Sequence, residues 1–509
     1  MKTIQLKFLD AKPFDTRVKS QNVKNPERWL GYFLGPAMIA CMSAICSQSY
    51  LNVFYTDVLK LSPVAGGLFL ALMPIISKIV DAITNVLMGR IIDKTHSVRG
   101  KARPWLLISG PLMAISSILL FAVPKSSTTL TVIWVTLTYN LYFCISYTMY
   151  NISNNLLIPL STRNNKQRDT LAMANSMGIN MIPGVLVSML MPMVLLPVLG
   201  VDRGRWAVAM SIIGFMAIPA TLIQYKFSRE RVTEDANTAA GVSEDHTFGE
   251  QVRGCVSSKY WLVIMGIIVI FQLYNNFQVT STIYYCNWVL GTYNDGITTT
   301  LVNAVGQAPL GFGILILWPL VKKFSKRNVM MAGCVIGIAG CVLCAMNPHS
   351  MGIVLIGLVL KSSGTLPIVY TLTAMLADAL DHVEWLNGFR CDGFSSSVFS
   401  IIMTVSAGVS AGIFNLLLGV TGYVAPLTDG TWVAQNAAVQ NLFIAGLFTV
   451  PAAGLFLIGF LLAFFNAEKE LPKMRQDIHD RHVAAAAARG EVYVSPEEKA
   501  ALEEAVRYD

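Results

Sequence analysis

A lysine and an aspartate stand three residues apart in an apolar segment, and they carry the most informative chemistry in the chain. Lys78 and Asp81 lie in the sequence SKIVDAITNVLMG, in which Thr84 and Asn85 follow the aspartate. In a helix these spacings place all four side chains on neighbouring parts of one face. A charge at membrane depth costs about 3 kcal/mol on insertion scales, so such groups normally pair and face a bundle interior or a watered cavity. We expect Lys78 and Asp81 to pair and to line such a cavity.

Two other apolar segments carry amides in positions that suit a hydroxylated ligand. In YTMYNISNNLLIP, Thr148, Asn151 and Asn155 recur at intervals of three and four residues, with Tyr147 beside them. Amides both donate and accept hydrogen bonds, which matches sugar hydroxyls. The segment FQLYNNFQ adds Gln272, Asn275 and Asn276 at similar spacing. The alternative is that these amides hold helices together, as is common in membrane proteins.

A second lysine is expected deep in the membrane. Lys361, in GIVLIGLVLKSSGTLP, stands about ten residues from the end of its segment, roughly 15 Å deep at 1.5 Å per residue. We predict that Gly364 and Pro367 loosen the helix after it, and broken helices often mark binding sites. Lys361 could then hold an anionic substrate group or pair with Asp81. The alternatives are a bond to a backbone carbonyl or a snorkelled surface lysine.

The composition of the chain describes a polytopic membrane protein. Of its 509 residues, 54% are hydrophobic and 13% are charged. We predict twelve spanning helices, which begin near residues 30, 64, 103, 129, 171, 206, 259, 299, 327, 351, 394 and 436. An even number places both termini on one side, and the lysines and arginines of the even-numbered loops make that side cytoplasmic. The net charge of +8 is therefore an orientation signal and does not indicate a nucleic-acid partner.

The polar segments divide the predicted all-α chain. We predict a cytoplasmic arm over 1–28, a six-helix bundle over 29–227, a cytoplasmic linker over 228–258, a second six-helix bundle over 259–465 and a partly helical cytoplasmic tail over 466–509. Two six-helix halves joined by a cytoplasmic loop are typical of alternating-access transporters. The sequence contains no nucleophile and base pair, phosphate loop or metal-type spacing, so we predict neither an enzyme nor a cofactor or metal site.

Four stretches together resemble a known family. They are DAITNVLMGRIIDKTHSVRGKARPW, YTDVLKLSP, IYYCNWVLG and ADALDHVEWLNGFRCDGFSSS, and the resemblance runs from about Gly31 to Phe465. They are similar to the glycoside-pentoside-hexuronide:cation symporters of the major facilitator superfamily. The resemblance implies two bundles around a central cavity, sugar uptake coupled to a cation in the cell membrane, and a monomer as the family default.

The resemblance also implies a site for the coupling cation. Asp81 matches an aspartate that binds the cation in the family, and Lys78 matches a basic residue one turn before it. Thr84 and Thr148 match positions close to that site, while Asn85 stands where the family has a second aspartate. Because one titratable group is sufficient for a proton, our hypothesis is proton coupling, with sodium second and uncoupled facilitation third.

Several charged sugar-binding groups of the family are absent. Asn151 replaces an aspartate and Asn155 an aromatic residue, while Ala40 and Thr404 replace an acid and a lysine. Lys361 has no counterpart among the family's binding residues. Together these differences favour, slightly, an anionic sugar such as a hexuronide.

Charged residues at the cytoplasmic ends match a family cluster that can act as a gate. They are Asp378, Asp381, Glu384 and Arg390 in the second half, with Asp93, Arg99 and Lys101 across in the first. The alternative is a solvated loop with incidental ion pairs worth about 0 to 1 kcal/mol each.

The expected function is the import of a glycoside, pentoside or hexuronide by cation symport. A sodium-dependent lysolipid carrier would need a wide apolar cavity, which the amide-rich segments argue against. A non-transporting sugar sensor would act through the tail, and removing the tail after about Ala467 would separate it from a carrier.

Overall fold

The computed structural model describes residues 4–5, 15–20, 22–46, 48–62, 64–97, 100–162, 165–231, 248–291, 296–389, 391–426 and 433–488. Within these ranges the chain is almost entirely helical. The exception is a parallel pair of two-residue strands, β1 (Ile4–Gln5) and β2 (Thr95–His96).

The first half of the chain contains six helical segments, several of which include a π-helical turn. The first combines η3 (Glu27–Leu34), α1 (Gly35–Ile45), α2 (Gln48–Val53) and η4 (Phe54–Val58); after η5 (Val64–Gly67), the second is α3 (Leu68–Asp93) and the third is α4 (Arg103–Phe121). The fourth combines α5 (Thr128–Asn140), η6 (Leu141–Tyr147) and α6 (Thr148–Ser161). The fifth runs through α7 (Asn165–Ser176), η7 (Met177–Met181), α8 (Ile182–Leu190), η8 (Met191–Leu195) and α9 (Leu196–Leu199), and the sixth through α10 (Arg203–Phe215) and α11 (Ala217–Lys226).

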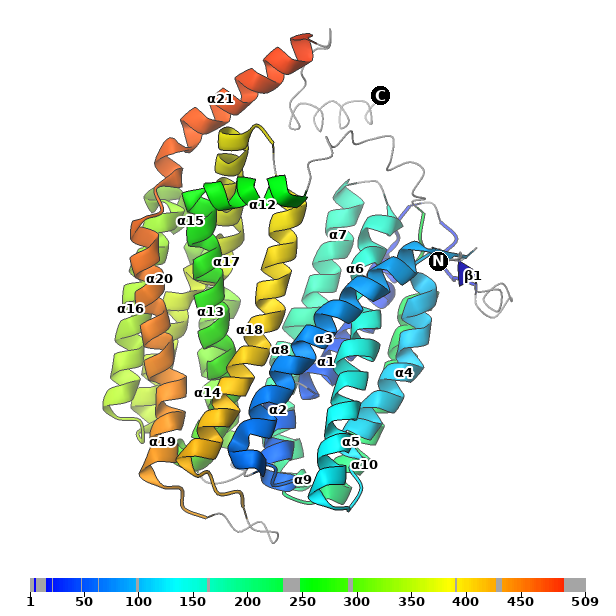
Figure 1. Cartoon of the computed structure of the whole chain (residues 1–509), viewed down its shortest axis with the longest axis vertical. Helices are drawn as coiled ribbons and strands as arrows, with labels where there is room; N and C mark the ends of the chain where they lie inside the picture. The colour runs from blue at the N-terminus through cyan, green and yellow to red at the C-terminus, as the bar shows by residue number, and fades with distance from the viewer. Residues whose placement is uncertain are drawn as a thin grey trace.

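The second half repeats this number of segments. After the short helix α12 (Phe248–Ser257), they are α13 (Lys259–Tyr285) with η10 (Cys286–Leu290), α14 (Gly296–Phe312) with α15 (Ile314–Phe324), α16 (Lys326–Met346), α17 (Met351–Asn387), α18 (Asp392–Thr421), and α19 (Ala437–Ile444) with η11 (Ala445–Thr449) and α20 (Val450–Ala463). A tail helix, α21 (Ala467–Ala488), follows and extends beyond the bundle (Figure 1). The helix α12 lies within the segment expected to be a polar linker.

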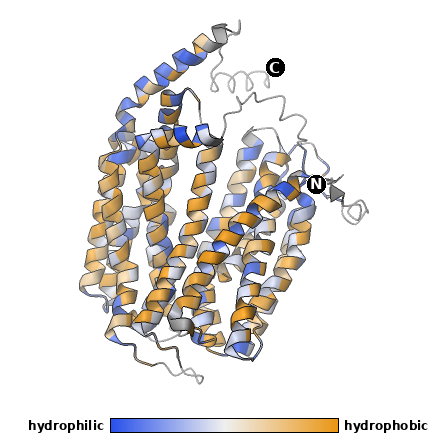
Figure 2. Ribbon diagram, in the orientation of Figure 1, coloured by the Kyte–Doolittle hydropathy of each residue, from blue (hydrophilic) through white to orange (hydrophobic). Residues whose placement is uncertain are grey.

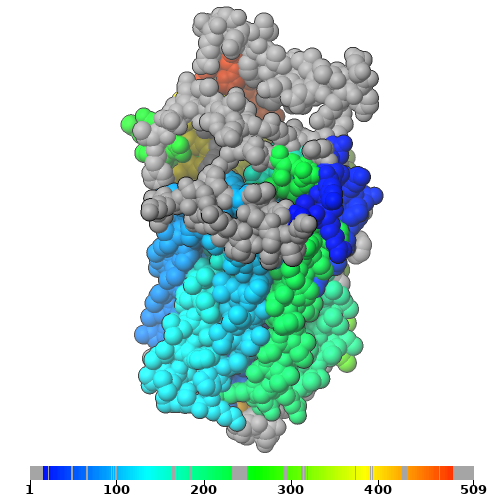
Figure 3. All heavy atoms as spheres, turned by 90° about the vertical axis from the view of Figure 1, so that its right-hand side faces the viewer, coloured from blue at the N-terminus to red at the C-terminus, as the bar shows by residue number. Residues whose placement is uncertain are grey.

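The two halves form separate helix bundles that lie side by side, as Figure 1 shows. Hydrophobic residues cover the outer surfaces of both bundles, and hydrophilic residues gather on α12 and α21 (Figure 2). Figure 3 shows one outer face of the first half as a closed wall of side chains, from α3 in blue through the cyan helices to α11 in green. The fold is an all-α membrane protein with two six-helix bundles.

Among the described residues, ten helices are long and apolar enough to cross a membrane. The two remaining segments of the twelve are residues 165–199 and 296–324, of which the first contains only a shorter apolar stretch, Leu186–Leu199. Both carry polar side chains in their middle, including Asn180 and Gln307. A segment can hold such groups at membrane depth where they line a cavity.

The bundles contact each other at the end that lies away from both termini. There the Tyr423 hydroxyl donates to Asp57 Oδ1 at 2.8 Å, and Asn415 Nδ2 donates to the Leu70 carbonyl at 3.1 Å. Thr300 Oγ1 donates to the Met189 carbonyl at 3.4 Å. The first contact joins η4 to the chain just after α18, the second joins α3 to α18, and the third joins α8 to α14.

Close glycine packing joins α16 to α17. A Cβ atom on Gly364 would lie 2.3 Å from the Gly337 backbone nitrogen, so the two helices are in backbone contact. Pro367 packs against Gly333 in the same contact, and α17 continues unbroken through it to Asn387. The expected loosening of the helix after Lys361 is therefore wrong, because the contact with α16 holds the proline-containing turn in place.

Gly364→Ala should destabilise the fold, whereas Gly352→Ala on the same helix should not. Overpacking against a backbone costs about 1 to 3 kcal/mol, and a Cβ on Gly352 meets nothing within 4 Å. Thermal unfolding of the purified protein in detergent should show a lower Tm for Gly364→Ala alone. Equal Tm values for the two variants would contradict the close contact.

Candidate functional site

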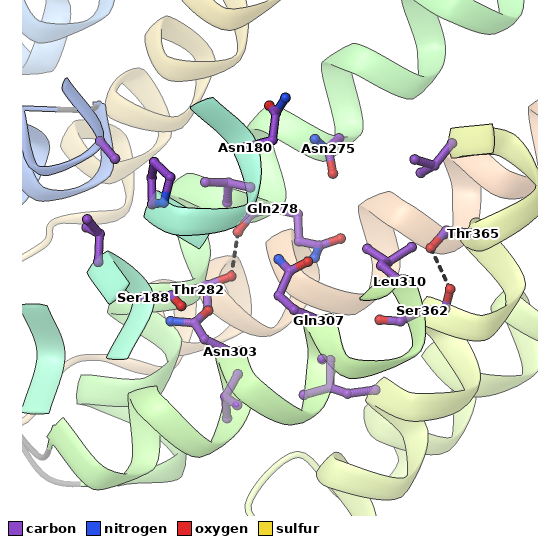
Figure 4. A pocket seen from close by; sticks show the side chains of 18 of the residues that line it. Asn180, Ser188, Asn275, Gln278, Thr282, Asn303, Gln307, Leu310, Ser362 and Thr365 are labelled. Atoms are coloured by element: carbon purple, nitrogen blue, oxygen red, sulfur yellow. Dashed lines mark hydrogen bonds between the residues drawn. The ribbon is translucent and has the colours of Figure 1, made fainter. Parts of the chain in front are cut away.

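A cavity of about 1090 Å³ lies between the two halves. The second half contributes α13, α14 and α17, with Leu447 of η11, and the first half contributes α7, η7 and α8, with Ala44 of α1 and Tyr50 of α2. Figure 4 shows its polar side chains, which extend from Ser188 and Asn180 on one side to Ser362 and Thr365 on the other. The volume is in the range of small-molecule sites, and the wall mixes apolar side chains with a few polar groups as such sites do.

Four amides in the wall of this cavity have unused hydrogen-bonding groups. Asn275 and Gln278 lie on α13, and Asn303 and Gln307 lie one turn apart on α14. None of the four side chains has a hydrogen-bond partner among the described residues. Asn180, by contrast, donates to the Ser176 carbonyl at 3.1 Å. The free amides can bind a ligand that both donates and accepts hydrogen bonds.

Lys361 lines the same cavity and is 3% exposed. Its Nζ atom donates to the Leu447 carbonyl at 3.3 Å, in the π-helical turn η11. A backbone carbonyl was one of the alternatives for this lysine, and in this structure it is the partner. π-Helical turns are frequent at functional sites.

The carboxylate of Asp81 lies at the centre of the expected cation site and is surrounded by hydrogen-bond donors. Thr148 Oγ1 and Asn85 Nδ2 donate to Oδ1 at 2.8 and 3.0 Å, and Lys78 Nζ lies 3.3 Å from Oδ2. Thr84 instead donates to the backbone carbonyls of Val80 and Asp81. The structure therefore brings Lys78, Asn85 and Thr148 to the carboxylate and turns Thr84 away from it.

The pair lies where the two bundles meet. Asp81 is 8% exposed, and the Lys78 ammonium stands 5.8 Å from the centre of the Phe143 ring. A Cβ atom on Gly408 of α18 would lie 2.6 Å from Lys78 Cγ, so the lysine packs on the second half. None of these residues lines the cavity described above.

The other predicted substrate residues do not line this cavity. They are Tyr147, Asn151, Asn155, Gln272, Asn276 and Thr404. Asn155 is exposed, with its amide 3.5 Å from Asn151 Oδ1, and Asn276 donates to the Gln272 backbone carbonyl at 2.7 Å. Their roles in binding stay predictions. Asn275 and Lys361 alone of the predicted set lie in the cavity wall.

The predicted gate acids have partners in the second half and the tail. Asp378 pairs with Lys326, Asp381 with Arg475 and Glu384 with His482, at 2.5, 3.2 and 3.1 Å. Arg475 and His482 lie on α21. Arg99 and Arg390 lie outside the described residues, as does the side chain of Asp93, so the expected pairing across the two halves stays a prediction.

The loop before α4 is held by an acid that the sequence did not single out. Glu230 accepts the backbone N–H groups of Lys101, Ala102 and Arg103 at 2.8 to 3.0 Å. Burial raises the pKa of Glu230, while these hydrogen bonds act in the opposite direction. The carboxylate thus stabilises the N-terminus of α4, where the helix dipole favours negative charge.

No group of three metal-ligating side chains occurs in the part of the chain that the structure describes. The residues that sequence reasoning missed are the polar groups of α7, η7, α8 and α14. Ser176 and Asn180, and likewise Asn303 and Gln307, stand four residues apart. The four-residue spacing could have indicated these residues from the sequence, because it places each pair on one face of a helix.

Comparison with known proteins places this architecture in a family. The family model described as "MFS/sugar transport protein" matches residues 31–469. The isoprimeverose transporter of Lactiplantibacillus pentosus is 27% identical over 447 residues, covering 86% of this chain and 88% of its own. The glucuronide carrier protein homolog of Escherichia coli (strain K12) is 26% identical, covering 89% of this chain and 95% of its own.

The solved structures share the fold. A bacterial homolog of the human lysosomal transporter Spinster, in an inward-facing and unoccupied conformation, superposes with a TM-score of 0.60 at 13% identity, covering 89% of this chain and 99% of that one. Family, relatives and fold describe membrane transporters and not enzymes. The chain belongs to the MFS/sugar transport proteins, as a member of the glycoside-pentoside-hexuronide:cation symporters of the major facilitator superfamily.

Proposed function

We propose that this protein imports a sugar together with a proton by alternating access in the cytoplasmic membrane, with both termini in the cytoplasm. The observation that carries the proposal is the cavity between the two bundles with four amides, Asn275, Gln278, Asn303 and Gln307, that have no partner among the described residues. An apolar ligand would leave these groups unpaired at a cost of about 1 to 3 kcal/mol each, whereas sugar hydroxyls satisfy them. The same polarity argues against a lysolipid in this cavity.

The surroundings of Asp81 favour a proton over sodium. Lys78, Asn85 and Thr148 all present hydrogens to its carboxylate, so the charge is compensated without a cation. A hard cation needs several oxygen ligands. Here the chain would have to turn the Asn85 amide and displace Lys78 to supply them. A proton needs only one oxygen of the carboxylate.

The contacts between the bundles support alternation. Asp57 with Tyr423, Leu70 with Asn415, and Met189 with Thr300 join the bundles at the end away from the termini. If the termini are cytoplasmic, these contacts close the outer end, which is the arrangement that we infer for an inward-facing state. In the outward-facing state the outer contacts break and the cytoplasmic acids Asp378, Asp381 and Glu384 exchange their partners for the basic loop of the first half. We propose the monomer as the transporting unit, because one chain contributes both sides of the cavity.

Asp81→Asn should keep sugar exchange but abolish accumulation. The amide retains the size and some of the hydrogen bonds of the carboxyl group but cannot carry a proton. Uptake and counterflow would be measured in liposomes under a proton gradient, a sodium gradient or neither. Asp202→Asn is the matched control, because Asp202 is exposed on the loop before α10. Full accumulation by Asp81→Asn would remove Asp81 from coupling, and accumulation by the unchanged protein under a sodium gradient alone would make sodium the ion.

Asn275→Leu should weaken sugar binding, whereas Asn276→Leu should not. Asn275 lines the cavity and has no partner among the described residues, whereas Asn276 donates to the Gln272 carbonyl and does not line the cavity. Losing one or two hydrogen bonds to hydroxyls costs about 1 to 3 kcal/mol, which corresponds to roughly 5- to 150-fold in Kd. The half-saturating sugar concentration in counterflow measures this. Equal effects of the two substitutions would place the sugar elsewhere.

A further inference from the structure

We propose that the cavity selects a sugar that carries one negative charge, a carboxylate or a sulfonate, and that Lys361 is the group that binds this charge. The inference rests on the proposed function, since it names the class of sugar that the same cavity accepts.

The charge inventory of the cavity is the first argument. Lys361 is the single charged side chain among the described residues that line it, and the other polar groups are neutral amides and hydroxyls. The cavity therefore has a net charge of +1 with Lys361 protonated. A neutral sugar bound there would leave this charge uncompensated, whereas a monoanion neutralises it.

The second argument is that the Lys361 ammonium is only partly satisfied. It is 3% exposed, and its partner in the described part of the chain is one backbone carbonyl, that of Leu447. An ammonium has three N–H donors, and a buried charge is costly unless it is both paired and hydrogen-bonded. An anionic oxygen of a ligand would both accept the unused N–H groups of Lys361 and balance its charge.

The acids of the membrane region that could compensate Lys361 have other partners. Asp81 is engaged by Lys78, Asn85 and Thr148. Asp57 accepts from Thr56 and Tyr423 at the outer end. Lys361 forms no ion pair in the described ranges, in contrast to Lys78, which bonds to a carboxylate one turn away.

The position of Lys361 also fixes the orientation of the ligand. Lys361, Ser362 and Thr365 lie on α17, whereas Asn303 and Gln307 come from α14. In Figure 4, Gln307 stands between Ser362 and Thr365 on one side and Ser188 on the other, and Asn303 lies next to Ser188. A sugar whose acid group meets α17 would thus extend its ring hydroxyls along α14 toward the first half.

The lysine stands on a rigid support. A Cβ atom on Gly340 would lie 2.5 Å from the Lys361 backbone nitrogen, which places the α17 backbone directly on α16. A group held in this way is preorganised, so little binding energy is lost in ordering it.

The test compares three methyl glycosides that share one pyranose ring and differ at carbon 6. They are methyl glucoside with a hydroxymethyl group, methyl glucuronide with a carboxylate and its 6-sulfonate analogue. Counterflow in liposomes without any ion gradient would give the half-saturating concentration of each, and size-exclusion chromatography would confirm that each variant is folded.

We expect at least one of the two anions to bind at least tenfold more tightly than the neutral glycoside, equivalent to about 1.4 kcal/mol. Which anion is preferred shows whether the acid group is a carboxylate or a sulfonate. Lys361→Gln and Lys361→Met should remove this preference, and Lys361→Arg should retain most of it. Lys125→Met, an exposed loop lysine, is the charge-matched control and should change nothing.

The outcomes separate the two proposals. A preference for the neutral glycoside, or an anion preference that survives in both Lys361→Gln and Lys361→Met, overturns the role of Lys361 and leaves sugar transport intact. No flux of any of the three, or of neutral pentosides and disaccharides, contradicts the proposed function and the inference with it.

Discussion

A charge within a membrane needs a partner, and this constraint governs the interior of the protein. Two lysines of the membrane region meet it differently. Lys78 has a carboxylate one turn away, supported by Thr148 from a second helix, so the pair is internally compensated. Lys361 has a carbonyl of a π-helical turn and faces a cavity. The charge of Lys78 is balanced by Asp81, whereas the charge of Lys361 is balanced only when an anionic ligand enters the cavity.

The elements around the cavity differ in stiffness. On one side α17 lies in backbone contact with α16 through Gly333, Gly337 and Gly364, and it stays helical through Pro367. The cavity is also bordered by two π-helical turns, η7 of the first half and η11, whose Leu447 carbonyl accepts from Lys361. Such turns carry an extra residue per turn and break the regular hydrogen-bond ladder. The cavity is thus bordered by α17, which is held in place by α16, and by η7 and η11, whose backbones can adopt alternative hydrogen-bonding patterns.

Local features of the site could be predicted from the sequence, and features that depend on helix packing could not. The Lys78 and Asp81 pair follows from a three-residue spacing within one helix, and the helix boundaries follow from apolar stretches that end in polar loops. The contact of Thr148 with Asp81 needed the family resemblance. Asn275 and Asn276 have identical chemistry and adjacent positions, so only the rotation of α13 against its neighbours decides which one meets the cavity. The unbroken course of α17 depends likewise on the glycines of another helix.

The tail helix α21 is attached to α17, so the two helices should move together. Arg475 and Asp477 of α21 bond to Asp381 and Trp385 of α17, and Met474 is buried, so the tail is fastened to the same helix that carries Lys361. With 22 residues, α21 is about 33 Å long. His482 of α21 also pairs with Glu384 of α17, so the two helices are joined along much of α21, and a rotation of α17 would carry the tail helix with it. A movement of α17 at the binding cavity would therefore change the position of a helix that extends beyond the bundle, where a label on α21 can follow it.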